Sequence, residues 1–313
     1  MIFFLIIRQN VIIMKKYFLL FLSVFLLFSC SDEIPEEELP MKSGRTVLAY
    51  LISNNKGGNL DTNLKNNLVD MYAGLASLKD TCTLLVYYRP YDTDHDGLEG
   101  PSILKFTSDG HGNINNKPVF EGMELNAKNV VSSAVLVHYD NEKHNATDTK
   151  DMTRILNKMK ELSPSESYGL IFGSHGTSWM PGKKYAGRSF GDDGGYSIDI
   201  PDMADVLEEV FDKPLDFILF DACMMGTAEV CYELKEATNY LIGSVVETHV
   251  YGNPYDVIIP KLFEKDIRYA EICKDYINYY SKKLNAWGVC SVIDCTKLDE
   301  LVVWIKDNLS NYS

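Results

Sequence analysis

The stretch LDFILFDACMMGTAEVCYELKEA (residues 215–237) contains the elements that decide the fold of this chain. LDFILFD is an unbroken apolar run without the alternation of a half-exposed strand, so it predicts a strand that is buried on both faces. TAEVCYELKEA then has the spacing of an amphipathic helix, with Thr227 as its N-cap. Strands of this kind belong to parallel sheets that are covered by helices. The stretch therefore predicts an α/β protein.

The same alternation of apolar strands and amphipathic helices extends through most of the chain. Strands are expected at residues 45–53, 81–89, 102–106, 132–139, 167–174, 215–221, 239–246 and 287–294. Helices are expected at residues 63–80, 149–163, 200–211, 227–237, 266–286 and 296–310. This order of elements favours a mostly parallel central sheet flanked by helices.

Two of the predicted strands end in residues suited to chemistry. One runs into His175 and Gly176 within GSHG, and the other runs into Asp221 and Cys223. Functional residues collect at such strand ends, and a cysteine with a histidine supplies the nucleophile and proton acceptor of acyl transfer. The start of the next helix favours a Cys223 thiolate, whereas a neighbouring carboxylate disfavours it, so Asp221 is better suited to binding a cation. The structural alternatives are a buried thiol, a turn-capping carboxylate and a loop histidine bonded to a neighbour.

The N-terminus has the pattern of a targeting segment. A positive region at residues 14–16 precedes the apolar run YFLLFLSVFLLF, which is too short for a membrane span, and LFSC resembles a lipobox. We expect a signal peptide at residues 1–29, with Met14 as a second plausible start, and acylation of Cys30. Residues 30–42 read as an acidic tether. These features predict an outer-membrane lipoprotein of a Gram-negative cell envelope, facing either the periplasm or the cell surface.

Charge and cysteine usage exclude several other classes of function. The net charge is −14, which argues against sequence-independent binding to nucleic acid. The scattered cysteines have no zinc-ligand spacing, although an oxidising compartment permits a disulfide that the sequence does not assign. Asp92, Asp94 and Asp96 follow the order that begins an EF-hand loop, but its twelfth position is Ile103. An acidic surface turn is therefore favoured over a calcium site.

Three segments resemble a known family. IFGSHGTSW (residues 171–179) and LFDACMMGTAEVCYELKEATNYLIGS (residues 219–244) resemble the catalytic blocks of the clostripain family of cysteine peptidases. RTVLAYLISNNKGGNL (residues 45–60) is similar to the first strand of that family and the loop after it. The resemblance implies a three-layer caspase-like sandwich over residues 43–313, related to gingipains and legumains. It also implies an endopeptidase that cleaves after Arg or Lys.

The resemblance further implies roles for individual residues. Cys223 would be the nucleophile, with His175 as its partner and the backbone N–H groups of Gly176 and Cys223 as the oxyanion hole. Asp221 would lie in the pocket for a basic P1 side chain, which Glu247 would help to shape. Trp179 would form a wall of the substrate cleft, or else belong to the core. This chemistry requires no cofactor, although some family members need calcium.

Relatives are often zymogens that are cut between the two catalytic residues. The basic loop PGKKYAGRSFGDDGG (residues 181–195) therefore predicts self-cleavage after Lys183, Lys184 or Arg188. The chain departs from the family in VETHVYGNPYD (residues 246–256), where relatives carry a Pro/Gly/Trp-rich loop, and in stopping at Ser313, where relatives often continue. The altered loop leaves an alternative function, a surface lipoprotein that binds basic peptides with little or no cleavage.

Overall fold

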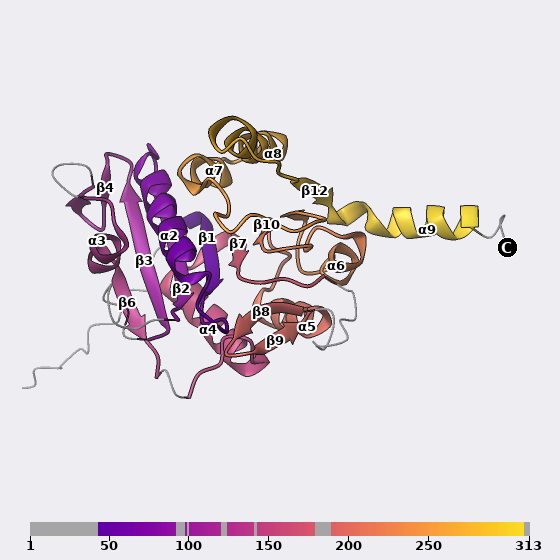
Figure 1. The fold of residues 1–313 in the computed structure, drawn as a ribbon, viewed down its shortest axis with the longest axis horizontal. Helices are drawn as coiled ribbons and strands as arrows, with labels where there is room; N and C mark the ends of the chain where they lie inside the picture. Colours follow the sequence, from indigo (N-terminus) through magenta and orange to yellow (C-terminus); the bar gives the residue numbers. More distant parts are fainter. Residues whose placement is uncertain are drawn as a thin grey trace, which may run out of the picture. The chain divides into compact units, whose positions relative to one another are not determined.

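A mixed sheet of ten strands forms the centre of the part of the chain that the structure describes (Figure 1). The structure is a computed structural model that describes residues 43–91, 98, 100–119, 124–140, 143–178 and 189–309. The strand order is β12-β11-β10-β7-β1-β2-β3-β4-β5, with β6 paired to β3. The strands of this sheet are β1 (Ser43–Ile52), β2 (Thr81–Arg89), β3 (Ser102–Asp109), β4 (Asn113–Ile114), β5 (Lys117–Pro118), β6 (Val135–His138), β7 (Ser165–Gly173), β10 (Phe217–Asp221), β11 (Tyr240–Gly243) and β12 (Ser291–Asp294).

The middle of the sheet is parallel. β1 pairs in parallel with β2 and β7, and β10 pairs in parallel with β7 and β11. Antiparallel strands flank this parallel block, because β3 pairs with β2 and β12 pairs with β11 in the opposite sense. The carboxyl ends of β7 and β10 therefore lie side by side at one edge, where an α/β sheet binds its ligands.

Helices cover both faces of the sheet. They are α2 (Asp61–Ala76), α3 (Ala127–Ser133), α4 (Thr149–Leu162), α5 (Ile200–Val210), α6 (Ala228–Glu233), α7 (Tyr255–Leu262), α8 (Tyr269–Asn278) and α9 (Leu298–Leu309). Along β1, alternate side chains enter two different cores. Leu48 and Tyr50 pack in a cluster with residues of α4 and α5, whereas Val47 and Ala49 pack in a second cluster with residues of α2 and α7. The predicted α/β sandwich with a mostly parallel sheet is confirmed.

Several elements differ from the sequence-based prediction. The helix expected at residues 227–237 is shorter, because α6 ends at Glu233 and turns follow. α7 was not predicted, since Pro254 directly precedes it and Pro260 lies inside it, and proline normally interrupts a helical pattern. The hairpin of β8 (Ser189–Asp193) and β9 (Tyr196–Asp199) lies in a glycine-rich stretch that the sequence assigns to a loop.

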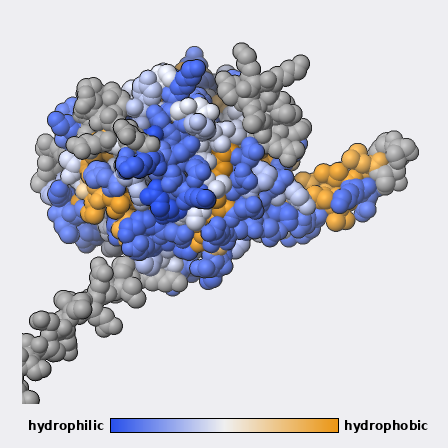
Figure 2. All heavy atoms as spheres, turned by 90° about the horizontal axis from the view of Figure 1, so that it is seen from below, coloured by the Kyte–Doolittle hydropathy of each residue, from blue (hydrophilic) through white to orange (hydrophobic). Residues whose placement is uncertain are grey.

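The last described residues form an exposed amphipathic helix. α9 extends past the edge strand β12 (Figure 1), and apolar side chains are visible on its surface (Figure 2). Trp304 and Leu309 are both 63% exposed. Among the described residues, no helix has the length and apolar character needed to cross a membrane.

Candidate active site

The register of β7 against β10 brings the two predicted catalytic segments together. Gly173 pairs with Asp221 at the last position of the ladder, and the N–H of Ser174 donates to the carbonyl oxygen of Asp221 over 3.3 Å. His175 and Cys223 each lie two residues beyond that paired position. The structure therefore places both residues at the carboxyl ends of the parallel strands, on adjacent chain segments.

Gly176 lies close to the segment that carries Cys223. A Cβ atom at Gly176 would lie 2.6 Å from the carbonyl oxygen of Cys223 and 2.9 Å from Cγ of Met225. Only glycine fits this approach without moving the backbone. Within the described residues, the N–H groups of Gly176 and Cys223 donate to no hydrogen-bond acceptor. Both N–H groups thus remain available to an oxyanion, as the predicted oxyanion hole requires.

The sulfur of Cys223 faces the chain segment that follows β11. The N–H of Thr248 donates to Cys223 Sγ over 3.3 Å, and the hydroxyl of Thr248 lies 3.6 Å from the same sulfur. Two further bonds hold this turn: the N–H of Met224 donates to the carbonyl of Val246, and that of Gly226 donates to the carbonyl of Ser244. An N–H donor directed at the sulfur stabilises negative charge on it.

The helix that follows Cys223 starts where the sequence predicted, directly after Thr227. α6 begins at Ala228, five residues beyond the thiol, and it has only six residues. Thr227 does precede it, but its hydroxyl lies 3.1 Å from that of Ser178 and makes no capping bond. A helix dipole acts only within the first turn. The donor that the structure gives to the Cys223 sulfur is therefore the N–H of Thr248, and a contribution from the helix start stays a prediction.

His175 is half-buried, and it makes one contact through its backbone carbonyl and one through its ring with the buried amide of Asn55. The N–H of Gly191 donates to the carbonyl of His175, and Nδ2 of Asn55 lies 3.2 Å from His175 Nε2. Burial lowers the pKa of His175, while the carboxylate of Asp192 acts in the opposite direction. The neutral imidazole is therefore favoured, and this is the form that accepts a proton.

Asn55 has a further unusual feature. Its side chain is 2% exposed, and its Oδ1 atom is buried without a hydrogen-bond partner among the described residues. A half-turn of the amide would exchange Oδ1 and Nδ2, and Oδ1 could then accept a hydrogen bond from Nε2–H of His175. That exchange would leave Nδ1 of His175 as the proton acceptor. The sequence did not identify Asn55, because nothing in SNNKGG distinguishes it from an ordinary loop asparagine.

Asp221 lies beneath the loop of residues 246–256. Its Oδ2 accepts hydrogen bonds from the Tyr255 hydroxyl over 2.8 Å, the N–H of Asn253 over 3.1 Å and the amide of Asn67 over 3.4 Å. Burial raises the pKa of the Asp221 carboxyl, and its bonds with Tyr255 and Asn253 oppose that shift. Glu247 lies in the same loop and is exposed. The two acidic residues predicted for the P1 pocket thus differ, since Asp221 is buried and hydrogen-bonded and Glu247 lies at the surface.

Other predicted residues lie outside the described residues. They are Cys30, the acidic set Asp92, Asp94 and Asp96, the aromatic Trp179 and the cleavage candidates Lys183, Lys184 and Arg188. In the described part of the chain, no group of three His, Cys, Asp or Glu side chains is arranged to hold a metal ion.

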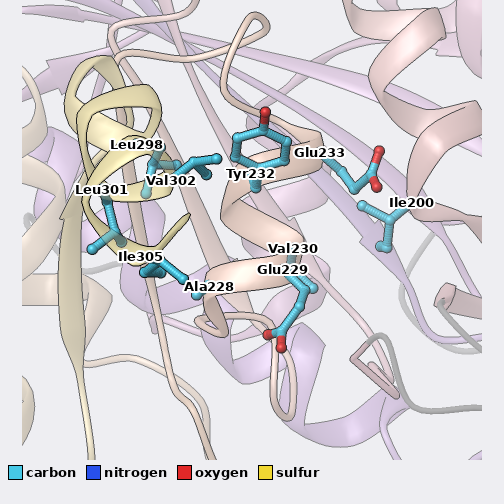
Figure 3. A pocket seen from close by; sticks show the side chains of 10 residues that line it. All are labelled: Ile200, Ala228, Glu229, Val230, Tyr232, Glu233, Leu298, Leu301, Val302 and Ile305. Atoms are coloured by element: carbon cyan, nitrogen blue, oxygen red, sulfur yellow. The ribbon is translucent and has the colours of Figure 1, made fainter. Parts of the chain in front are cut away.

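An apolar cavity lies away from these catalytic candidates. Its volume is about 340 Å³, and Figure 3 shows the side chains of α6 and α9 that face each other across it. Neither Cys223 nor His175 lines this cavity.

Solved structures of cysteine proteases are similar to this chain. A secreted C11 cysteine protease of Bacteroides thetaiotaomicron, "iotapain", has a TM-score of 0.66 and 26% identity, over 86% of this chain and 71% of that chain. A secreted C11 protease of the same organism, in complex with an irreversible peptide inhibitor, has a TM-score of 0.68 and 29% identity over the same shares. An inactive zymogen C11 protease from Parabacteroides distasonis has a TM-score of 0.63 and 28% identity, over 84% of this chain and 65% of that chain.

The family comparison covers nearly all of the described fold. Among curated protein sequences, none matches this chain. The clostripain family model matches residues 49–313, which include the parallel block of the sheet except the first part of β1, and both predicted catalytic segments. The chain therefore belongs to the clostripain family and is a clostripain-like cysteine peptidase.

Proposed function

We propose that this chain is an endopeptidase that cleaves after Lys or Arg, with Cys223 as nucleophile and His175 as general base. The observation that carries this proposal is the pairing of Gly173 with Asp221, since it brings the two residues to adjacent segments at one sheet edge. An unpaired N–H at Gly176 supports the same assignment.

The proposed reaction is a two-step acyl transfer. Sγ of Cys223 attacks the scissile carbonyl carbon and its proton passes to His175, while the N–H groups of Gly176 and Cys223 hold the oxyanion. His175 then returns the proton to the leaving amine, and the C–N bond breaks to leave a thioester. In the second step His175 takes a proton from water, which attacks the thioester and releases the acid and the Cys223 thiol. We assign Asn55 as the positioning residue that fixes the orientation of the His175 ring.

Asp221 supplies the proposed preference for a basic P1 side chain. Three donors already bind Oδ2 of this carboxylate, so an incoming ammonium or guanidinium would pair with Oδ1. A buried ion pair of this kind discriminates strongly against an uncharged side chain, because that substrate would leave the carboxylate unpaired. Glu247 would add negative potential at the exposed side of the same loop.

The structure of β8 narrows the proposed site of self-cleavage. Ser189 follows Arg188 directly and is buried, and both its N–H and its carbonyl are bonded to Thr177. Proteases cut accessible, locally unfolded segments, so a cut after Arg188 would require Ser189 of β8 to break its bonds with Thr177. We therefore favour Lys183 and Lys184. Replacing both with Ala should leave the chain uncut, whereas Arg188→Ala should be processed normally; the reverse pattern would reject this assignment.

We further propose that the enzyme works outside the cytoplasm, attached to the outer membrane through a lipid on Cys30. The lipobox resemblance of LFSC supports this, and iotapain is likewise a secreted protease. Incorporation of a radiolabelled fatty acid should occur in the native chain and be lost in Cys30→Ser. Equal labelling of both chains would reject the anchor.

A peptidase assay tests the function directly. The substrates are fluorogenic peptides with Lys, Arg or norleucine at P1, since norleucine keeps an aliphatic chain without the charge. Cys223→Ala should remove all cleavage, and Cys231→Ala, which changes a buried thiol of the core, should retain it. Equal cleavage of the norleucine peptide would reject the assignment of Asp221. Binding of the basic peptide by the folded, processed chain without turnover would support the alternative function, a peptide-binding lipoprotein.

A further inference from the structure

Two thiols approach each other at the edge of the sheet near β12. Cys273 lies in α8 and Cys290 lies directly before β12, and their sulfur atoms are 3.0 Å apart. A disulfide bond is about 2.05 Å long, so the two atoms need to close by only about 1 Å. Among the other cysteines of the described chain, none has a second thiol within bonding distance.

We propose that Cys273 and Cys290 are a redox pair that forms an intramolecular disulfide in the extracytoplasmic environment. The contact itself prepares one of the two sulfurs for reaction. Hydrogen bonding between the thiols lowers the pKa of Cys273, and the same contact together with burial raises the pKa of Cys290. Cys273 is thus the thiol that reacts first, because the thiolate is the attacking species.

The oxidant required is a second disulfide, such as that of a thiol–disulfide oxidoreductase or oxidised glutathione. The Cys273 thiolate attacks one sulfur of that disulfide and releases the other as a thiolate. Cys290 then loses its proton and attacks Sγ of Cys273, which expels the second thiolate of the oxidant. Two protein thiols are oxidised and one external disulfide is reduced to two thiols. A secreted relative is consistent with a compartment that holds such oxidants.

The cross-link would fix the segment before Cys290, which contacts the loop of residues 246–256. Gly288 lies against Tyr276 at the end of α8, where a Cβ atom would come within 2.9 Å of the tyrosine ring. The neighbouring Trp287 carbonyl accepts a hydrogen bond from Nε2 of His249 over 2.6 Å. His249 follows Thr248, whose N–H reaches Cys223 Sγ. Two hydrogen bonds therefore connect the segment next to the disulfide with the proposed nucleophile. An influence of the disulfide on the reactivity of Cys223 rests on the proposed function.

The existence of the disulfide can be tested without any catalytic activity. We suggest the Cys223→Ala chain, because it lacks the competing thiol and cannot process itself. After treatment with oxidised glutathione, the intact mass should fall by two hydrogens, and digestion should yield peptides joined through Cys273 and Cys290. Free thiols at both positions, or a glutathione adduct that never closes, would overturn the proposal.

A thermal assay provides a second readout. Constraining a loop of this size predicts that reductant lowers Tm of the oxidised Cys223→Ala chain by roughly 5–10 °C. Adding Cys273→Ser and Cys290→Ser should abolish that reductant effect, whereas adding Cys82→Ser should preserve it. An equal reductant effect with and without the pair would contradict the proposal. Because these chains are inactive by design, failure here is distinct from failure of the peptidase assignment.

Discussion

Replacing Asn55 with Asp should shift the pH dependence of peptide cleavage upward. The substitution keeps the shape of the side chain but places a carboxylate where a neutral amide now lies 3.2 Å from His175 Nε2. An anion at that distance favours the protonated imidazole, so the pKa of His175 rises. Burial currently holds that pKa below its ordinary value. If neutral His175 is the base, the acidic limb of the rate profile must move to higher pH.

The size of the shift follows from the distance. Opposite charges about 3 Å apart attract by roughly 5 kcal/mol at an effective dielectric constant of about 20. The new carboxylate must itself be desolvated, since the Asn55 site is almost completely buried. The measured range for such pairs is about 1–3 pKa units, each unit corresponding to about 1.4 kcal/mol. We therefore expect the acidic limb to rise by about 1–2 pH units.

The assay is kcat/KM for a Lys-P1 peptide across the pH range, with folding checked by circular dichroism at each pH. Asn59→Asp is the matched control, because Asn59 contacts Asn55 but is exposed, so its charge is screened. Asn55→Ala should lower kcat about 2–10-fold with little change in KM, as expected for the loss of one orienting hydrogen bond. A folded Asn55→Asp chain with the profile of Asn59→Asp would refute the role of Asn55.

Three further substitutions test other parts of the site. Asp221→Asn should lower kcat/KM for basic P1 residues by about 30-fold or more. Burial raises the pKa of Asp221, so the ionised carboxylate destabilises the folded chain above the folded-state pKa. This destabilisation fades as pH falls through that pKa. Asp221→Asn should therefore raise Tm at neutral pH more than at acidic pH, and no pH dependence in that gain would contradict the reasoning. Gly176→Ala should cost about 1–3 kcal/mol in unfolding free energy and reduce kcat, because its Cβ meets the Cys223 carbonyl at 2.6 Å; unaltered stability and rate would argue against that contact. Tyr255→Phe removes a donor to Asp221 and should cost about 1.5–3 kcal/mol at neutral pH, measured by denaturant unfolding. The same change in the Asp221→Asn chain should cost less, and an equal cost would show that the bond with Asp221 is not its cause.

The sequence predicted the fold because the buried strands carry unbroken apolar runs. β2 was expected at residues 81–89 and spans Thr81–Arg89, and both predicted catalytic segments lie where strands were expected to end. The contacts around the site could not be predicted in the same way. Asn55 is 120 residues from His175, and Thr248 is 25 residues from Cys223. Such contacts depend on strand order and loop path, and no local pattern encodes either of them.

The proposed catalytic residues and the proposed specificity residue are held by different kinds of contact. His175 and Cys223 are held by backbone bonds to Gly191 and by the Met224 and Gly226 bonds to the segment after β11. Backbone bonds of this kind survive most side-chain substitutions, and the fold is shared with proteases only 26–29% identical to this chain. The carboxylate of Asp221, by contrast, is bonded to the side chains of Tyr255 and Asn67 and to one N–H of the loop of residues 246–256. The same loop contacts the Cys223 turn through backbone atoms of Val246 and Thr248, which tolerate changes of side chain. If Asp221 binds the P1 side chain as proposed, the departure of this loop from the family pattern bears more on the P1 preference than on the proposed nucleophile.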